Sequence, residues 1–135
     1  MNFLNRLQPL GLLVLRLALG AIMIAHGWQK IASHMQGIMG MLPHLGIPAW
    51  MGYLVVAAEF GGGILVVIGL ATRFAAFAIF IDMSVAILKV HLKNGLTGQG
   101  GFEFPMALAA IAFALICFGA GPIALDGIRG GKGTR

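Results

Sequence analysis

Apolar stretches of helix length follow one another along this chain and are separated by short polar segments. Four of them cover residues 10–32, 51–70, 74–90 and 103–118. About 20 apolar residues are enough to cross a bilayer as a helix, and short connections make consecutive helices antiparallel. The pattern therefore predicts an all-α polytopic membrane protein, an up-down four-helix transmembrane bundle that forms a single transmembrane domain over residues 1–135.

The segment between the first two stretches has a different pattern. Residues 33–49 read SHMQGIMGMLPHLGIPA, in which proline, glycine and histidine break any long apolar run. Apolar side chains still recur there at helical spacing, at Ile38, Met41, Leu42 and Leu45. We therefore expect a short interfacial or re-entrant segment between the first two helices.

Composition supports a membrane protein and excludes a soluble one. The mean hydropathy is +0.96 and only 10% of the residues are charged, against about 25% in soluble domains. The net charge of +5 comes from scattered lysines and arginines, with no basic run alternating with aromatic residues. The expected partner is therefore the lipid bilayer and not nucleic acid.

The distribution of the cations predicts an orientation. An even number of spans places both termini on one side of the membrane, and that side would hold Arg6, Arg73, Arg129, Lys132 and Arg135. The other side would hold Lys30, Lys89 and Lys93. The positive-inside rule then favours both termini in the cytoplasm, with a partly disordered cytoplasmic tail over residues 123–135.

Three charged residues lie inside the apolar stretches. They are Arg16 in the first, Glu59 in the second and Asp82 in the third. An unpaired charge at the centre of a bilayer costs at least ~2.5 kcal/mol, so we expect Arg16 to pair with Glu59, Asp82 or both inside the bundle. Such a pair either fixes the helix register or forms the polar floor of a ligand pocket, and the sequence leaves both open.

A second polar group lies near the other ends of the helices. It is rich in hydrogen-bond donors and consists of His26, Gln29, Lys30, Lys89, His91, Gln99 and Glu103. Donors of this type suit quinone carbonyls, a lipid phosphate or an oxyanion, and histidine is the natural proton carrier at neutral pH. The lysines have an ordinary explanation too, because a lysine near a helix end extends to water.

These groups define the predicted site. The residues expected to bind a cofactor are Arg16, His26, Gln29, Lys30, Glu59, Asp82, His91 and Glu103, and those with candidate catalytic roles are His26, Glu59 and Asp82. Haem is disfavoured, because only His26 and His91 could plausibly hold its iron between two helices. No metal site is assigned, since Glu59, Asp82 and His26 lack a metal-ligand spacing. The single Cys117 rules out a dithiol, so a redox role must use a cofactor, such as a quinone, or a substrate.

As an ensemble, several short motifs resemble the DoxX family of small bacterial membrane proteins. They are Leu15-Arg16 with Gly20, His26-Gly27 with Lys30, Gly46-Ile47-Pro48, Glu59-Phe60-Gly61-Gly62, the turn at 69–73, His91 and Gly119-Ala120-Gly121-Pro122. The resemblance covers about residues 10–126. It implies a four-helix protein of the bacterial inner membrane whose polar positions correspond to Arg16, His26, Lys30 and Glu59, without a catalytic residue that could be transferred.

The resemblance leaves two functions open. The family takes its name from a subunit of a thiosulfate:quinone oxidoreductase, and other members are linked to membrane redox complexes, which implies a quinone-linked oxidoreductase or its membrane subunit. Distant relatives act in export or receptor assembly without being enzymes, which implies a non-enzymatic scaffold or assembly factor. A homo-oligomer or a redox-complex partner would fit either function.

Overall fold

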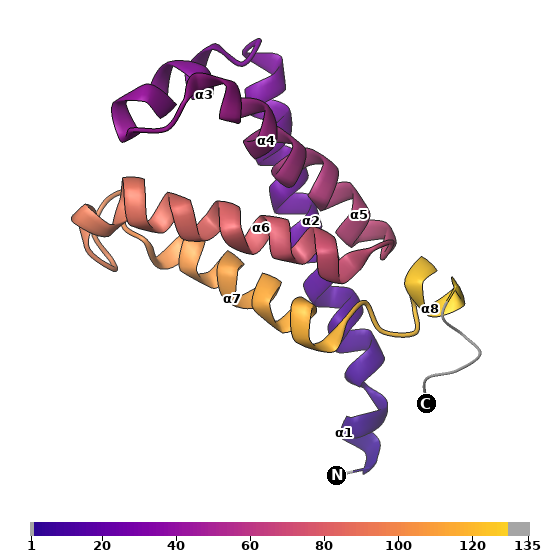
Figure 1. Ribbon diagram of the computed structural model, residues 1–135. Coiled ribbons are helices and arrows are strands. Elements are labelled where there is room, and N and C mark those ends of the chain that lie inside the picture. Colours follow the sequence, from indigo (N-terminus) through magenta and orange to yellow (C-terminus); the bar gives the residue numbers. More distant parts are fainter. Residues whose placement is uncertain (1, 130–135) are drawn as a thin grey trace.

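The computed structural model describes residues 2–129, which contain helices and no strand (Figure 1). Three helical segments are long and apolar enough to cross a membrane, Gln8–Ala32, Ala49–Ile68 and Thr72–Asn94, and Glu103–Phe118 is a shorter apolar helix. In chain order the elements are α1 (Asn2–Arg6), α2 (Gln8–Ala32), α3 (Gln36–Met41), η1 (Leu42–Leu45), η2 (Ala49–Met51), α4 (Gly52–Val56), η3 (Ala57–Gly61), α5 (Gly62–Ile68), α6 (Thr72–Ala86), η4 (Ile87–His91), η5 (Leu92–Asn94), α7 (Glu103–Phe118) and α8 (Leu125–Arg129).

The helices pack as two pairs. The helix formed by α4, η3 and α5 lies along α2, and α6 lies along α7 (Figure 1). The pairs meet in an apolar core whose central side chains are 0% exposed: Leu19, Met23, Val66, Ile79, Ala112 and Leu115. Away from this core the pairs diverge, so that α3 lies apart from the loop between η5 and α7.

Glycines set the close approach of α2 and α5. A Cβ atom added at Gly63 would lie 3.0 Å from the Gly20 carbonyl oxygen and 2.9 Å from Ile24 Cγ1, and one added at Gly20 would lie 2.8 Å from the Gly63 carbonyl oxygen. The two backbones are therefore in direct contact. Small residues allow this kind of helix packing inside a bilayer.

This contact predicts the effect of a larger side chain. The Gly63→Leu variant should lose about 1 to 3 kcal/mol of unfolding free energy, because α2 and α5 must move apart to make room. Unfolding by sodium dodecyl sulfate in mixed micelles measures the loss. Gly11→Leu is the matched control, since a Cβ atom at Gly11 meets nothing within 4 Å. Equal stability of the two variants would contradict the packing role of Gly63.

The beginning of the C-terminal tail is held against the turn between α5 and α6. The Asp126 carboxylate accepts hydrogen bonds from the amides of Ala71 and Thr72, each at 2.8 Å, and the Asp126 amide donates to the Gly69 carbonyl oxygen at 2.8 Å. Asp126 thus caps the amino end of α6. Within the tail over 123–135, which is expected to be partly disordered, residues 125–129 form α8, and residues 130–135 lie outside the described part of the chain.

Candidate functional site

The candidate site begins at Glu59, which lies in the π-helical segment η3 in the middle of the second long apolar helix. Single π-helical turns inside α-helices are frequent at functional sites. The backbone of Phe60 approaches α2 closely at Gly27, where an added Cβ atom would lie 2.7 Å from the Phe60 nitrogen. This approach brings Glu59 within reach of the next turn of α2.

Lys30 occupies that turn of α2 and forms an ion pair with Glu59. Its Nζ donates to Glu59 Oε2 at 2.7 Å, and the two side chains are 24% and 6% exposed. Removing one member of a buried ion pair leaves an uncompensated charge, which is costly. The pair therefore ties α2 to the second long helix next to the close contact of Gly27 with Phe60.

Asp82 on α6 adds a second carboxyl group beside this pair. It interacts electrostatically with both Glu59 and Lys30. Its Oδ2 atom is buried and has no hydrogen-bond partner among the described residues. Buried polar atoms of this kind are uncommon and often belong to a binding or catalytic site. Three helices thus contribute one ammonium and two carboxyl groups to a single point.

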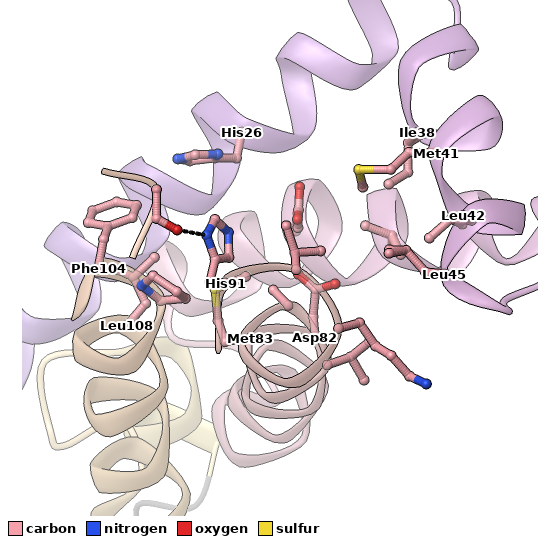
Figure 2. Close-up of a pocket in the computed structure, with 18 of the residues that line it drawn as sticks. His26, Ile38, Met41, Leu42, Leu45, Asp82, Met83, His91, Phe104 and Leu108 are labelled. Carbon is pink, nitrogen blue, oxygen red and sulfur yellow. Dashed lines mark hydrogen bonds between the residues drawn. The ribbon is translucent and has the colours of Figure 1, made fainter. Parts of the chain in front are cut away.

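These three side chains line a cavity of about 530 Å³ between the two helix pairs (Figure 2). Its other ionisable residues are His26 on α2, Lys89 and His91 on η4, and Glu103 at the start of α7. Figure 2 shows His26, His91 and Phe104 towards one end of the cavity and the apolar side chains of α3 and η1 towards the other, with Asp82 between them. The apolar wall includes Ile38, Met41, Leu42 and Leu45.

The histidines differ in how they are held. His91 Nδ1 lies 2.7 Å from the Gly100 carbonyl oxygen, which Asn94 Nδ2 also contacts at 3.0 Å. Because a carbonyl can only accept, His91 Nδ1 is the donor, and a neutral ring then leaves Nε2 as an acceptor. The His26 ring lies 5.9 Å from the Phe104 ring, and the side-chain contacts of His26 leave it accessible to a ligand in the cavity.

Arg16 does not belong to this site, and its predicted pairing with Glu59 or Asp82 is wrong. The side chain is 1% exposed, yet it donates to four backbone carbonyl oxygens instead of a carboxylate: Val66 at 3.0 Å, Val67 at 2.8 Å, Ala120 at 3.2 Å and Ile123 at 2.6 Å. The last carbonyls of a helix have no intrahelical partner. Arg16 therefore caps the carboxyl end of α5 and joins it to the segment after α7.

Arg16 does not meet Glu59 or Asp82 because of the register between α2 and the second long helix. Gly20 lies against Gly63 and Gly27 against Phe60, so Arg16 is level with the end of α5 while Lys30 is level with Glu59. The two levels are 14 residues apart along α2, or about 21 Å. Approximate depths counted from helix ends cannot resolve which cation meets which carboxylate.

The structure also sorts the remaining predicted residues. It brings His26, Lys30, Glu59, Asp82, His91 and Glu103 to one cavity, whereas Arg16 and Gln29 are absent from its lining. Among the apolar residues of the 35–50 segment, Met41 lines the cavity, and Met35, Met39 and Trp50 do not. Phe104 and Leu108 were missed, because nothing in the sequence distinguishes them within the apolar run of α7. No group of three metal-ligating side chains occurs among the described residues.

Comparison with known proteins adds a family. The DoxX family model matches residues 11–92. The candidate oxidoreductase CatD of Bacillus subtilis is 34% identical over 83% of both chains. The inner membrane protein YqjF of Escherichia coli is 28% identical over 73% of this chain and 84% of its own. An uncharacterised Haemophilus influenzae protein is 33% identical over 93% of this chain and 96% of its own. No solved structure matches the chain significantly.

Proposed function

This chain belongs to the DoxX family, and from that premise we propose that it is the membrane subunit of a quinone-linked oxidoreductase that binds a small lipophilic ligand, a quinone, in its cavity. It is a multi-pass protein of the bacterial inner membrane. The observation that carries the proposal is the Lys30–Glu59 ion pair with Asp82 at the wall of a cavity inside apolar helices. Intramembrane ionisable groups commonly mark ligand or proton pathways.

The chemistry of the cavity suits a quinone. Its volume of about 530 Å³ lies within the usual range for small-molecule sites. His26 and Lys30 can donate hydrogen bonds to a ring carbonyl, and Glu59 or Asp82 can relay protons to it. The apolar wall formed by α3 and η1 would receive the ring face and the first part of its hydrocarbon tail. The name of CatD, a relative described as a candidate oxidoreductase, supports the same class of reaction.

The proposal includes an orientation. An up-down bundle with both termini in the cytoplasm would place Arg6 and Arg73 on the cytoplasmic side and Lys30, Lys89 and Lys93 towards the periplasm, as the positive-inside rule favours. The α7 helix has 16 residues, or about 24 Å, so it would need a locally thin bilayer or flanking residues to complete the crossing.

A histidine exchange tests ligand binding directly. The His26→Ala variant should bind a short-chain ubiquinone about tenfold more weakly, because it loses one hydrogen-bond donor to the ring carbonyl. Quenching of tryptophan fluorescence and the thermal shift of the purified protein measure the affinity. His34→Ala is the control, since His34 is outside the cavity lining. The proposal fails if the lipid extract of the unaltered protein contains no quinone and the purified protein binds none.

The alternative of a non-enzymatic scaffold is supported by an exposed face of small residues on α7, whereas Gly62 does not support it. Gly62 packs inside the chain, where an added Cβ atom would lie 3.3 Å from Ile79, so that position cannot serve an outside partner. Ala107 and Ala110 on α7 are exposed and offer a small-residue face to another helix. For a scaffold, Ala110→Leu should abolish co-purification of a membrane partner while His26→Ala retains it. For a quinone-linked subunit, His26→Ala should lower the quinone-dependent activity and Ala110→Leu should leave that activity unchanged.

A further inference from the structure

Between the level of Glu59 and Asp82 and the level of Arg16, the described helices carry no polar side chain. From the Glu59 and Asp82 carboxyl groups towards the Arg16 end, the helices read only apolar residues, over 17–25 in α2, 60–68 in the second long helix, 74–81 in α6 and 104–116 in α7. The shortest of these runs, the eight residues in α6, corresponds to roughly 12 Å. The side chains that fill this half of the helix bundle at its centre, among them Leu19, Val66, Ala76 and Ala112, are 0% exposed.

The other half contains the cavity, whose lining combines polar groups from several elements with the apolar wall of α3 and η1. The ionisable groups that face Asp82 there come from α2, η3, η4 and α7, namely His26, Lys30, Glu59, Lys89, His91 and Glu103. The loop between η5 and α7 contributes Gly98, Gly100 and Gly101 to the same cavity. His26, Lys89 and Glu103 are exposed, whereas Glu59 is 5% exposed. Exposure therefore decreases from the loop to the carboxyl pair.

We infer that water and protons reach the Glu59–Asp82 carboxyl pair only from the side of the membrane that holds the 33–48 segment and the 95–102 loop. A cavity with several polar groups on its wall takes up water, and a close-packed apolar core stays dry. A proton in a dry apolar region has no group to carry it, and the cost of placing a charge there is prohibitive. The cavity is thus a proton inlet that opens to one side. The close-packed core and Arg16 together block water and protons from the side of the termini, and this block is called the seal.

One consequence rests on the proposed function. If the cavity binds a quinone, every proton that the ring takes up or releases crosses to the loop side and none to the side of the termini. With the orientation proposed above, that side is the periplasm. The inlet itself depends only on the positions of polar and apolar residues and not on the identity of the ligand.

Paired cysteines on one helix test the inlet. In a Cys117→Ser background, Ala86→Cys places a thiol in the cavity wall and Ala76→Cys places one in the sealed core, both on α6. A charged, membrane-impermeant methanethiosulfonate reacts with the thiolate, so labelling requires that the thiol has lost its proton to water. Gln99→Cys in the loop and Arg73→Cys at the opposite end of the bundle show which face of the membrane the reagent reaches. The proteins are reconstituted in right-side-out and inverted vesicles.

We expect Ala86→Cys to be labelled together with Gln99→Cys, in the same vesicle orientation, and at least about tenfold more slowly from the side of Arg73→Cys. We expect Ala76→Cys to be unlabelled from either side in folded protein, with Ala112→Cys as its substitute if it does not fold. Labelling of Ala86→Cys from the Arg73 side, from both sides or from neither overturns the inference, as does fast labelling of Ala76→Cys.

The same variants separate this inference from the proposed function. Short-chain ubiquinone should protect Ala86→Cys from labelling if it binds in the cavity. One-sided labelling without protection keeps the inlet and contradicts the quinone, whereas protection with two-sided labelling does the reverse.

Discussion

Replacing Arg16 with leucine should destabilise the protein strongly, to an extent comparable with breaking the Lys30–Glu59 ion pair. The variant loses the hydrogen bonds to the carbonyls of Val66, Val67, Ala120 and Ile123 and leaves the buried ones, those of Val66 and Ala120, without this donor. An unsatisfied buried polar group costs about 1 to 3 kcal/mol, so a loss of at least about 3 kcal/mol in unfolding free energy is expected. Unfolding by sodium dodecyl sulfate in mixed micelles measures it.

The control is Arg6→Leu, which removes the same charge from an exposed position in α1. Arg16→Lys should recover only part of the stability, because an ammonium group cannot donate in the directions of the planar guanidinium fork. Equal stability of Arg16→Leu and Arg6→Leu would show that the capping role is wrong. Quinone affinity in the fraction that stays folded should be unchanged, since Arg16 is outside the cavity lining.

Replacing Lys30 with methionine should affect both stability and ligand binding. The variant leaves the Glu59 carboxylate buried next to Asp82 without its cation, and breaking a buried pair in this way costs about 3 to 5 kcal/mol. It also removes the donor that we propose for a quinone carbonyl. We expect lower resistance to unfolding and at least tenfold weaker binding of a short-chain ubiquinone. Lys93→Met is the control, because Lys93 is exposed and outside the cavity lining.

A double variant separates the two effects. Lys30→Met with Glu59→Gln contains no uncompensated carboxylate, so it should regain most of the stability that Lys30→Met loses. Its quinone affinity should stay low, because the donor is still absent. If the double variant is as unstable as Lys30→Met, the ion pair is not the source of the instability. If Lys30→Met binds quinone normally, Lys30 does not contact the ligand.

The sequence pattern was sufficient for the helices and insufficient for their register. Long apolar runs predict membrane-spanning helices because a bilayer allows few other structures, and three helices of the described residues are long and apolar enough to cross. Register depends on close backbone contacts such as that of Gly20 with Gly63, which no single-sequence pattern specifies. For this reason the side chain that meets Glu59 was predicted as Arg16 and is Lys30.

The ionisable residues of the candidate site were predictable because charged residues are rare in the apolar helices. In an apolar chain each intramembrane ionisable residue stands out, so Glu59, Asp82, His26 and Lys30 could be selected as candidates without a structure. Their roles in binding remain predictions. The apolar wall was harder, since Phe104 and Leu108 look like any other lipid-facing or core residue until the helix packing is known.

The π-helical turns have a consequence for the comparison of related sequences. Both η3, which carries Glu59, and η4, which carries Lys89 and His91, arise when a helix accommodates one extra residue. Relatives that lack this residue should therefore align with a single-position gap near 57–61 or 87–91, and an alignment forced through without gaps would match Glu59 or His91 to the wrong column. Deletion of Ala58 alone would return this turn to a regular α-helix while the flanking turns keep their packing, so the direction of the Glu59 side chain relative to Lys30 would change although the helices stay in place.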